Sequence, residues 1–144
     1  MPITLTPEDG RGATLTLGTS TWETNTAITG ITFAGMTRNT LETTHLGTNT
    51  ARTYIIEDLY DAGELTVEFL HQDITAPPVI TATNTTADTI TVTYPLSTGA
   101  TNAATVAASG YCTEFVPGAL AVGELSKGSA KFKLTGAITF TSAT

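Results

Sequence analysis

The chain has 144 residues, only 13% of them charged, and a formal net charge of −7. This length fits one domain with a core that needs no disulfides, so we expect residues 1–144 to form a single domain. The acidic balance argues against a protein that grips nucleic acid or an anionic membrane, because both tasks require a basic surface.

The residue pattern of the N-terminal region contains no basic segment followed by an apolar run, so we expect no signal peptide and synthesis in a cytoplasm. The one cysteine, Cys112, allows no internal disulfide. No apolar run approaches the length of a membrane span, and we expect no membrane partner.

Threonine makes up roughly a quarter of the residues. Threonine is β-branched, which favours strands, and it tolerates a solvated sheet face. Apolar residues alternate with threonine or charged residues at 13–17, 64–71, 88–94 and 127–135. We therefore predict an all-β domain of about eight short strands, in a sandwich or barrel, with at most one short helix.

The most polar part of the chain lies at residues 37–71. The pattern predicts a strand at 40–45, a long excursion at 46–63 with one helical turn over 57–61, and a strand at 64–71. Such an excursion between two strands is either a catalytic loop or a contact arm.

Residues suited to catalysis are present in this stretch but form no recognisable set. His45 and His71 have no partners at metal-ligand spacing, and Cys112 has no nucleophile signature around it. The carboxylates do not match the spacing of a calcium loop and are interpreted as solvated charge; they are Glu57, Asp58, Asp61, Glu64 and Glu68. We expect no catalytic, cofactor or metal site and no enzyme activity.

The contact-arm interpretation fits the strand pattern better. Strands with one apolar and one threonine face indicate antiparallel sheets with a solvated side. The edges of such sheets must be covered, closed or paired with another copy. A small all-β chain with a long polar arm is therefore suited to self-assembly in rings.

Several segments, in this order and spacing, resemble the major tail tube proteins of long-tailed (siphovirus-type) bacteriophages. They are TRNTLETTH at 37–45, ARTYI at 51–55, DAGELTVE at 61–68, GYCTEFVPG at 110–118 and residues 124–135. The resemblance covers the chain from about residue 28 to residue 140, and no single motif carries it alone.

The resemblance implies a two-sheet β-sandwich subunit whose inner sheet joins the barrel of a hexameric ring. Stacked rings would form the virion tail, with 46–63 as the inter-ring loop and 1–12 and 136–144 as terminal segments. The inter-ring candidates within this loop are Gly47, Thr48, Asn49, Arg52, Tyr54, Asp58 and Tyr60. Many family members place a helix after the strand that matches 64–71, whereas Pro77 and Pro78 here predict a shortened or absent helix.

The implied partners are further copies of the chain and other tail proteins, namely the tape measure, the terminator and the baseplate. Genomic DNA would pass through the bore without specific binding. Six copies at −7 give a formal ring charge of −42 (6 × −7), and an acidic bore would repel phosphate. The strands at 40–45 and 64–71 would line the bore as barrel strands of the main sheet. Glu42, Glu64 and Glu68 are therefore the lumen candidates, and the alternative is that these charges lie on the outer surface or at an interface.

Two other functions are compatible with the same sequence. One is a different ring of the same fold, such as a tail terminator, a baseplate ring or a secretion tube. The other is an Ig-like binding domain on a virion or cell surface.

Overall fold

The computed structural model describes residues 10–18, 28–48, 50–70 and 86–144, which contain eight strands and no helix. The predicted all-β class is confirmed. The helical turn predicted over 57–61 is wrong, because this segment is extended and Asp61 instead bridges to Thr37. The short helix considered near 72–82 lies outside the described residues.

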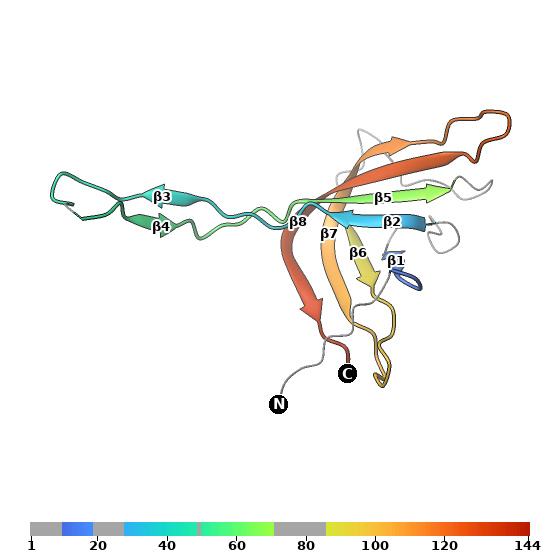
Figure 1. Ribbon diagram of the computed structural model, residues 1–144, viewed down its shortest axis with the longest axis horizontal. Helices are drawn as coiled ribbons and strands as arrows, with labels where there is room; N and C mark the ends of the chain where they lie inside the picture. Colours follow the sequence, from blue (N-terminus) through green and yellow to red (C-terminus); the bar gives the residue numbers. More distant parts are fainter. Residues whose placement is uncertain (1–9, 19–27, 49, 71–85) are drawn as a thin grey trace.

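Six strands form one antiparallel sheet in the order β1-β6-β7-β8-β5-β2, and two form a separate hairpin (Figure 1). The six strands are β1 (Thr14–Leu17), β2 (Ile28–Phe33), β5 (Glu64–Leu70), β6 (Asp88–Thr93), β7 (Thr105–Val116) and β8 (Lys127–Thr141). The hairpin strands are β3 (Thr40–Glu42) and β4 (Tyr54–Ile56).

Strict alternation places one face of the large sheet in a single core. Every second residue is buried along 15–17 of β1, 65–69 of β5, 90–92 of β6 and 128–134 of β8, and the residues between them are polar. The buried apolar side chains on these strands are Leu15, Leu17, Leu65, Val67, Phe69, Ile90, Val92, Ala130, Phe132 and Leu134. The threonine and charged face is left toward solvent or toward a partner.

The large sheet curls because its two central strands are long and irregular. β7 and β8 pair along nearly their whole length, with register shifts between Ala107 and Ser109 and between Cys112 and Glu114. Gly136, with φ of 73°, lies in the first of these irregular regions, and bulges of this kind bend and twist a strand. The curl brings side chains of β1 and β6 into the same core cluster as those of β5, which gives the sandwich-like packing.

We call the six-stranded sheet the body. The two-stranded sheet belongs to an arm that projects from the body (Figure 1). β3 pairs with β4 alone, with Thr40 opposite Ile56 and Glu42 opposite Tyr54. The prediction that 40–45 is a strand of the main sheet is therefore wrong. The arm comprises residues 36–62, longer at its N-terminal side than the predicted 46–63.

Candidate assembly surfaces

Two glycines form the root at which the arm leaves the body. Gly35 and Gly63 have φ of 98° and 85°, a region that favours glycine. A Cβ on Gly63 would overlap the carbonyl oxygen of Gly35, so the two limbs can lie this close only without a side chain there. Next to them, Ala34 N donates to Glu64 O at 2.8 Å, which continues the β2–β5 pairing up to the root.

An ion pair ties the returning limb of the arm to the body. Asp61 Oδ1 accepts from Lys133 Nζ of β8 and from Gly63 N, both with short contacts of 2.8 and 2.7 Å. The hydrogen bond from Lys133 and the one from Gly63 hold the pKa of Asp61 below its usual value. Asp61 N and O also exchange backbone hydrogen bonds of 2.8 and 3.0 Å with Thr37 on the other limb.

Aromatic and apolar side chains complete the root. The Arg38 guanidinium lies 5.9 Å from the centre of the Tyr60 ring, within cation–π distance. The Tyr60 hydroxyl accepts a long hydrogen bond of 3.4 Å from Ile138 N on β8. Met36 and Phe140 line a shallow hollow with these residues. We conclude that the root is fixed to the body by side chains from both limbs.

Beyond the root, the arm exposes apolar side chains on both faces. Leu41, Ile55 and Ile56 lie on β3 and β4, yet each is more than half exposed. Leu46 and Leu59 are more exposed still. A two-stranded hairpin that buries nothing has little intrinsic stability in water. Such a surface is typical of a segment that packs against a partner.

The end of the arm is a polar turn around His45. Its Nδ1 accepts from Gly47 N at 3.0 Å, and its backbone N and O bond Thr48 at 3.2 and 2.8 Å. These bonds occupy the imidazole locally, as expected of a structural histidine. Arg52 lies 3.8 Å from Glu42 across the hairpin, with both side chains largely exposed.

The structure distributes the predicted inter-ring residues along the arm rather than gathering them in one place. Gly47 and Thr48 form the turn, Arg52 and Tyr54 lie along the returning limb, and Tyr60 belongs to the root. Asp58 is exposed between β4 and the root, and Asn49 lies outside the described residues.

The predicted lumen residues fall on two different parts of the molecule. Glu42 belongs to the arm, which corrects its predicted place on a barrel strand. Glu64 and Glu68 lie on the face of β5 that points away from the core, with Glu64 opposite Lys133 of β8. The other two lysines of the chain, Lys127 and Lys131, lie on the same face of β8. This face is therefore mixed in charge, not uniformly acidic.

A second exposed apolar surface was not predicted from the sequence. The loop between β7 and β8, residues 117–126, carries Leu120, Val122 and Leu125, all strongly exposed. We call residues 117–126 the tip loop. Loops are expected to be polar, so the small and apolar residues between Pro117 and Ser126 are the sequence signal that could have identified this surface.

The described residues contain no group of three or more His, Cys, Asp or Glu side chains that could hold a metal ion. Cys112 is half-buried against the core, and burial raises the pKa of its thiol, which disfavours the reactive thiolate. His71 lies outside the described residues. In the part of the chain described, no helix is long and apolar enough to cross a membrane.

No protein-family model and no curated protein matches the sequence. The fold, in contrast, is found in cryo-EM structures of injection particles. A chain of the PVC sheath/tube terminator of an extracellular contractile injection system, in the extended state, has a TM-score of 0.75 at 9% identity, covering 97% of this chain and 100% of that one. A chain of the anti-feeding prophage tube terminating cap has a TM-score of 0.71 at 12% identity, covering 99% and 95%.

A chain of the PVC sheath-tube complex in the extended state also matches, with a TM-score of 0.61 at 8% identity, covering 90% of this chain and 88% of that one. At such identities the likeness establishes the fold alone. The chain therefore has the fold of chains found in a sheath/tube terminator, a tube terminating cap and a sheath-tube complex.

Proposed function

We propose that this protein is a structural, non-enzymatic subunit of the tube of a phage tail or tail-like injection particle. Six copies form a ring, and rings stack through the arm. The observation that carries the proposal is the arm itself, anchored at its root by Asp61 and Lys133 but apolar and exposed beyond it. An arm fixed in direction, with an apolar surface that none of the described residues covers, is suited to reach a neighbouring copy.

The solved structures with this fold support the same function. Their chains belong to a sheath/tube terminator, a tube terminating cap and a sheath-tube complex, and another match at 14% identity and TM-score 0.59 comes from a 6-fold symmetrised baseplate. Those particles support an extracellular tail-like location and other tail proteins as partners. They favour a contractile system, whereas the sequence resemblance favours a long-tailed phage.

The charge of the bore bears on what the tube could carry. If the polar face of β5 and β8 lines the bore, Glu64 and Glu68 are balanced there by three lysines. A nearly balanced surface repels phosphate less than an acidic one. DNA as cargo therefore rests on the sequence resemblance alone.

Electron microscopy of the purified protein tests the proposal. We expect negatively stained samples at high concentration to contain rings with six-fold symmetry and short tubes. A protein that stays monomeric at every concentration, and is absent from purified particles as rings, would overturn it.

A terminator or cap ring is the second candidate, because a terminator-assembly chain and a cap chain both match over nearly the whole of this chain. Copy number separates the two functions. A tube subunit is present in many rings per particle, whereas a terminator is present in a single ring at one end. Quantitative mass spectrometry of purified particles measures this ratio.

The binding-domain and enzyme alternatives have distinct outcomes. A surface-binding domain would remain monomeric and adhere to a particular cell or glycan. A hydrolase would show turnover in an activity screen, and loss of that turnover in His45→Ala would reverse the structural interpretation.

A further inference from the structure

We propose that the apolar outer part of the arm docks on the tip loop of the next copy along the stack. The outer arm is defined as the described residues 43–48 and 50–56, and the tip loop is residues 117–126. This inference rests on the proposed function and adds the partner surface that receives the arm.

The outer arm offers a compact set of uncovered apolar groups. Tyr54, Ile55 and Ile56 are more than half exposed on consecutive positions of β4, and Leu46 is fully exposed near the turn. Consecutive strand residues point to opposite faces, so both faces of the hairpin present apolar surface. A partner that clasps the hairpin would bury more of it than a flat surface would.

The tip loop is the apolar counterpart on the body. Leu120, Val122 and Leu125 are all at least 74% exposed, so nothing in the chain's own described fold covers them. The loop is short and closed at its base by the β7–β8 pair Val116 with Ser129. Its position is therefore fixed relative to the body, which a docking site requires.

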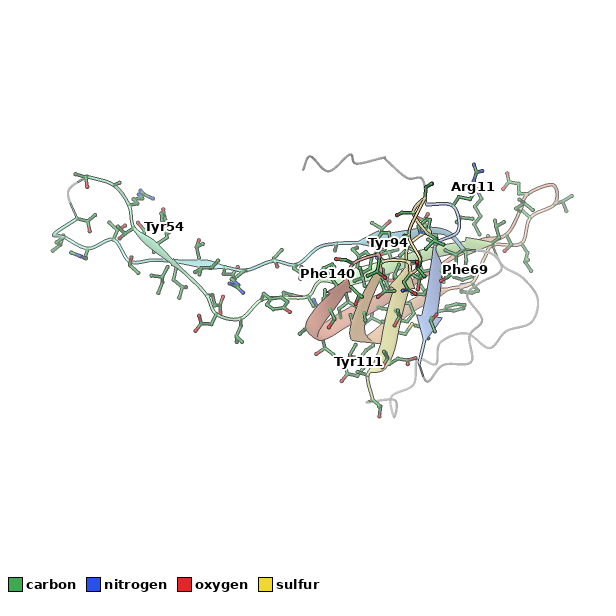
Figure 2. All side chains as sticks on the ribbon, turned by 90° about the horizontal axis from the view of Figure 1, so that it is seen from below. Arg11, Tyr54, Phe69, Tyr94, Tyr111 and Phe140 are labelled. Carbon is green, nitrogen blue, oxygen red and sulfur yellow. The ribbon has the colours of Figure 1, made fainter. Side chains whose placement is uncertain are left out.

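The two surfaces lie at opposite ends of the long axis of the molecule. The arm extends from one end and the β7–β8 loop from the other, in both views (Figures 1 and 2). Contact between two different surfaces at opposite ends is heterologous and does not close between two copies. Each copy therefore offers one arm and one tip loop, and repetition of the contact extends a stack along the axis.

Charge permits this pairing. Arg52 is the one charged residue of the outer arm, and it lies 3.8 Å from Glu42 on the opposite strand, which leaves this part of the hairpin close to neutral. The tip loop also contains only one charged residue, Glu124. Two copies that each carry −7 repel one another at most orientations, whereas a contact between these two weakly charged surfaces brings few like charges together.

Other occupants of the outer arm give different results. Two arms that pack on each other would form an isologous contact limited to pairs of copies. Another tail protein as the partner would leave the purified chain unable to form tubes, although rings could form.

A pair of introduced charges tests the contact. Ile55→Lys and Val122→Glu should each leave rings intact but reduce the number of tubes by about tenfold, because an unpaired charge weakens each apolar contact and the loss is repeated around each ring. The double variant pairs the two charges and should return tube number to within about twofold of the wild type. Tubes unaffected by either single change, or not restored in the double variant, would overturn the docking site. A wild-type chain that forms neither rings nor tubes would instead overturn the proposed function.

Disulfide trapping tests proximity directly. In a Cys112→Ala background, Ile55→Cys combined with Val122→Cys should give, after mild oxidation of tubes, a ladder of crosslinked species longer than dimers. Leu59→Cys combined with Val122→Cys is the matched control, because Leu59 is exposed on the arm but outside its outer part, and it should give no ladder. Dimers from Ile55→Cys alone would show arm–arm packing and reject the proposal.

Discussion

The body and the arm are built from the same kind of strand sequence but differ in what covers it. In the body, Leu65 of β5 is completely buried, whereas Ile55 of β4 in the arm is 55% exposed. Both lie in antiparallel pairs of ordinary register. The difference is that the body strand has a core beneath it and the arm strand has only its hairpin partner (Figure 2).

This contrast teaches that the apolar residues of the two regions have separate tasks. Those of the body stabilise the subunit, because their burial removes apolar area from water on folding. Those of the arm gain this stabilisation only when another molecule covers them. Substitutions in the body should therefore change the free energy of unfolding, whereas substitutions in the arm should change assembly.

The largest effect on the isolated subunit is expected at the centre of the core. Phe132 is 1% exposed and packs in the main cluster, so Phe132→Ala should lower the free energy of unfolding by about 3–5 kcal/mol. Ile55→Ala, the matched arm variant, should change it by less than about 0.5 kcal/mol. Urea unfolding of both variants measures the difference, and equal losses would mean that the arm is part of the folded core.

The strands of the body could be predicted because each has a strong local pattern. β6 alternates apolar and polar residues throughout, β5 does so from Glu64 to Phe69, and the structure buries the predicted face of both. The threonine content and this alternation likewise predicted the all-β class. Strand position and fold class could be predicted because both depend on residues that are close together in the sequence.

The arm boundary could not be predicted in the same way. Residues 40–45 have the pattern of a half-solvated sheet strand, and nothing local indicates that their partner is β4 instead of a strand of the body. The contact between Asp61 and Lys133 joins residues 72 positions apart. Such pairings depend on the curl of the whole sheet, which local pattern does not encode.

The next effect in size is expected at the arm root. Gly63→Ala places a side chain at positive φ and against the Gly35 carbonyl, so we expect a loss of about 2 kcal/mol in unfolding free energy. Gly99 is the matched control, with φ of 89° and open space around it, and Gly99→Ala should cost about 1 kcal/mol. Thermal and urea unfolding give both values. A loss at Gly63 no greater than at Gly99 would show that the limbs are not held together there.

A smaller effect is expected from the ion pair at the root. Because the folded state holds the pKa of Asp61 below its ordinary value of 3.8, the pair stabilises the fold above that pH and is lost as the pH falls through the lowered pKa. Asp61→Asn should therefore be less stable than the wild type at neutral pH, and the difference should shrink as the pH falls below 3.8. Unfolding midpoints between pH 2 and 7 measure this, with Asp58→Asn as a control for loss of one carboxylate. A constant difference at all pH values would exclude the ion pair as the cause.

The smallest effect on the subunit should accompany a complete loss of ring stacking. Deletion of residues 47–51 shortens the end of the arm but keeps the hairpin bond from Thr43 N to Thr53 O. Since the described residues of this segment lie outside the core cluster, the unfolding free energy should stay within about 0.5 kcal/mol of the wild type. Stacking should fail, because the shortened arm no longer reaches the neighbouring ring. Rings without tubes in electron micrographs would separate the two tasks that the body and the arm perform, and tubes of normal length would mean that the end of the arm does not join the rings.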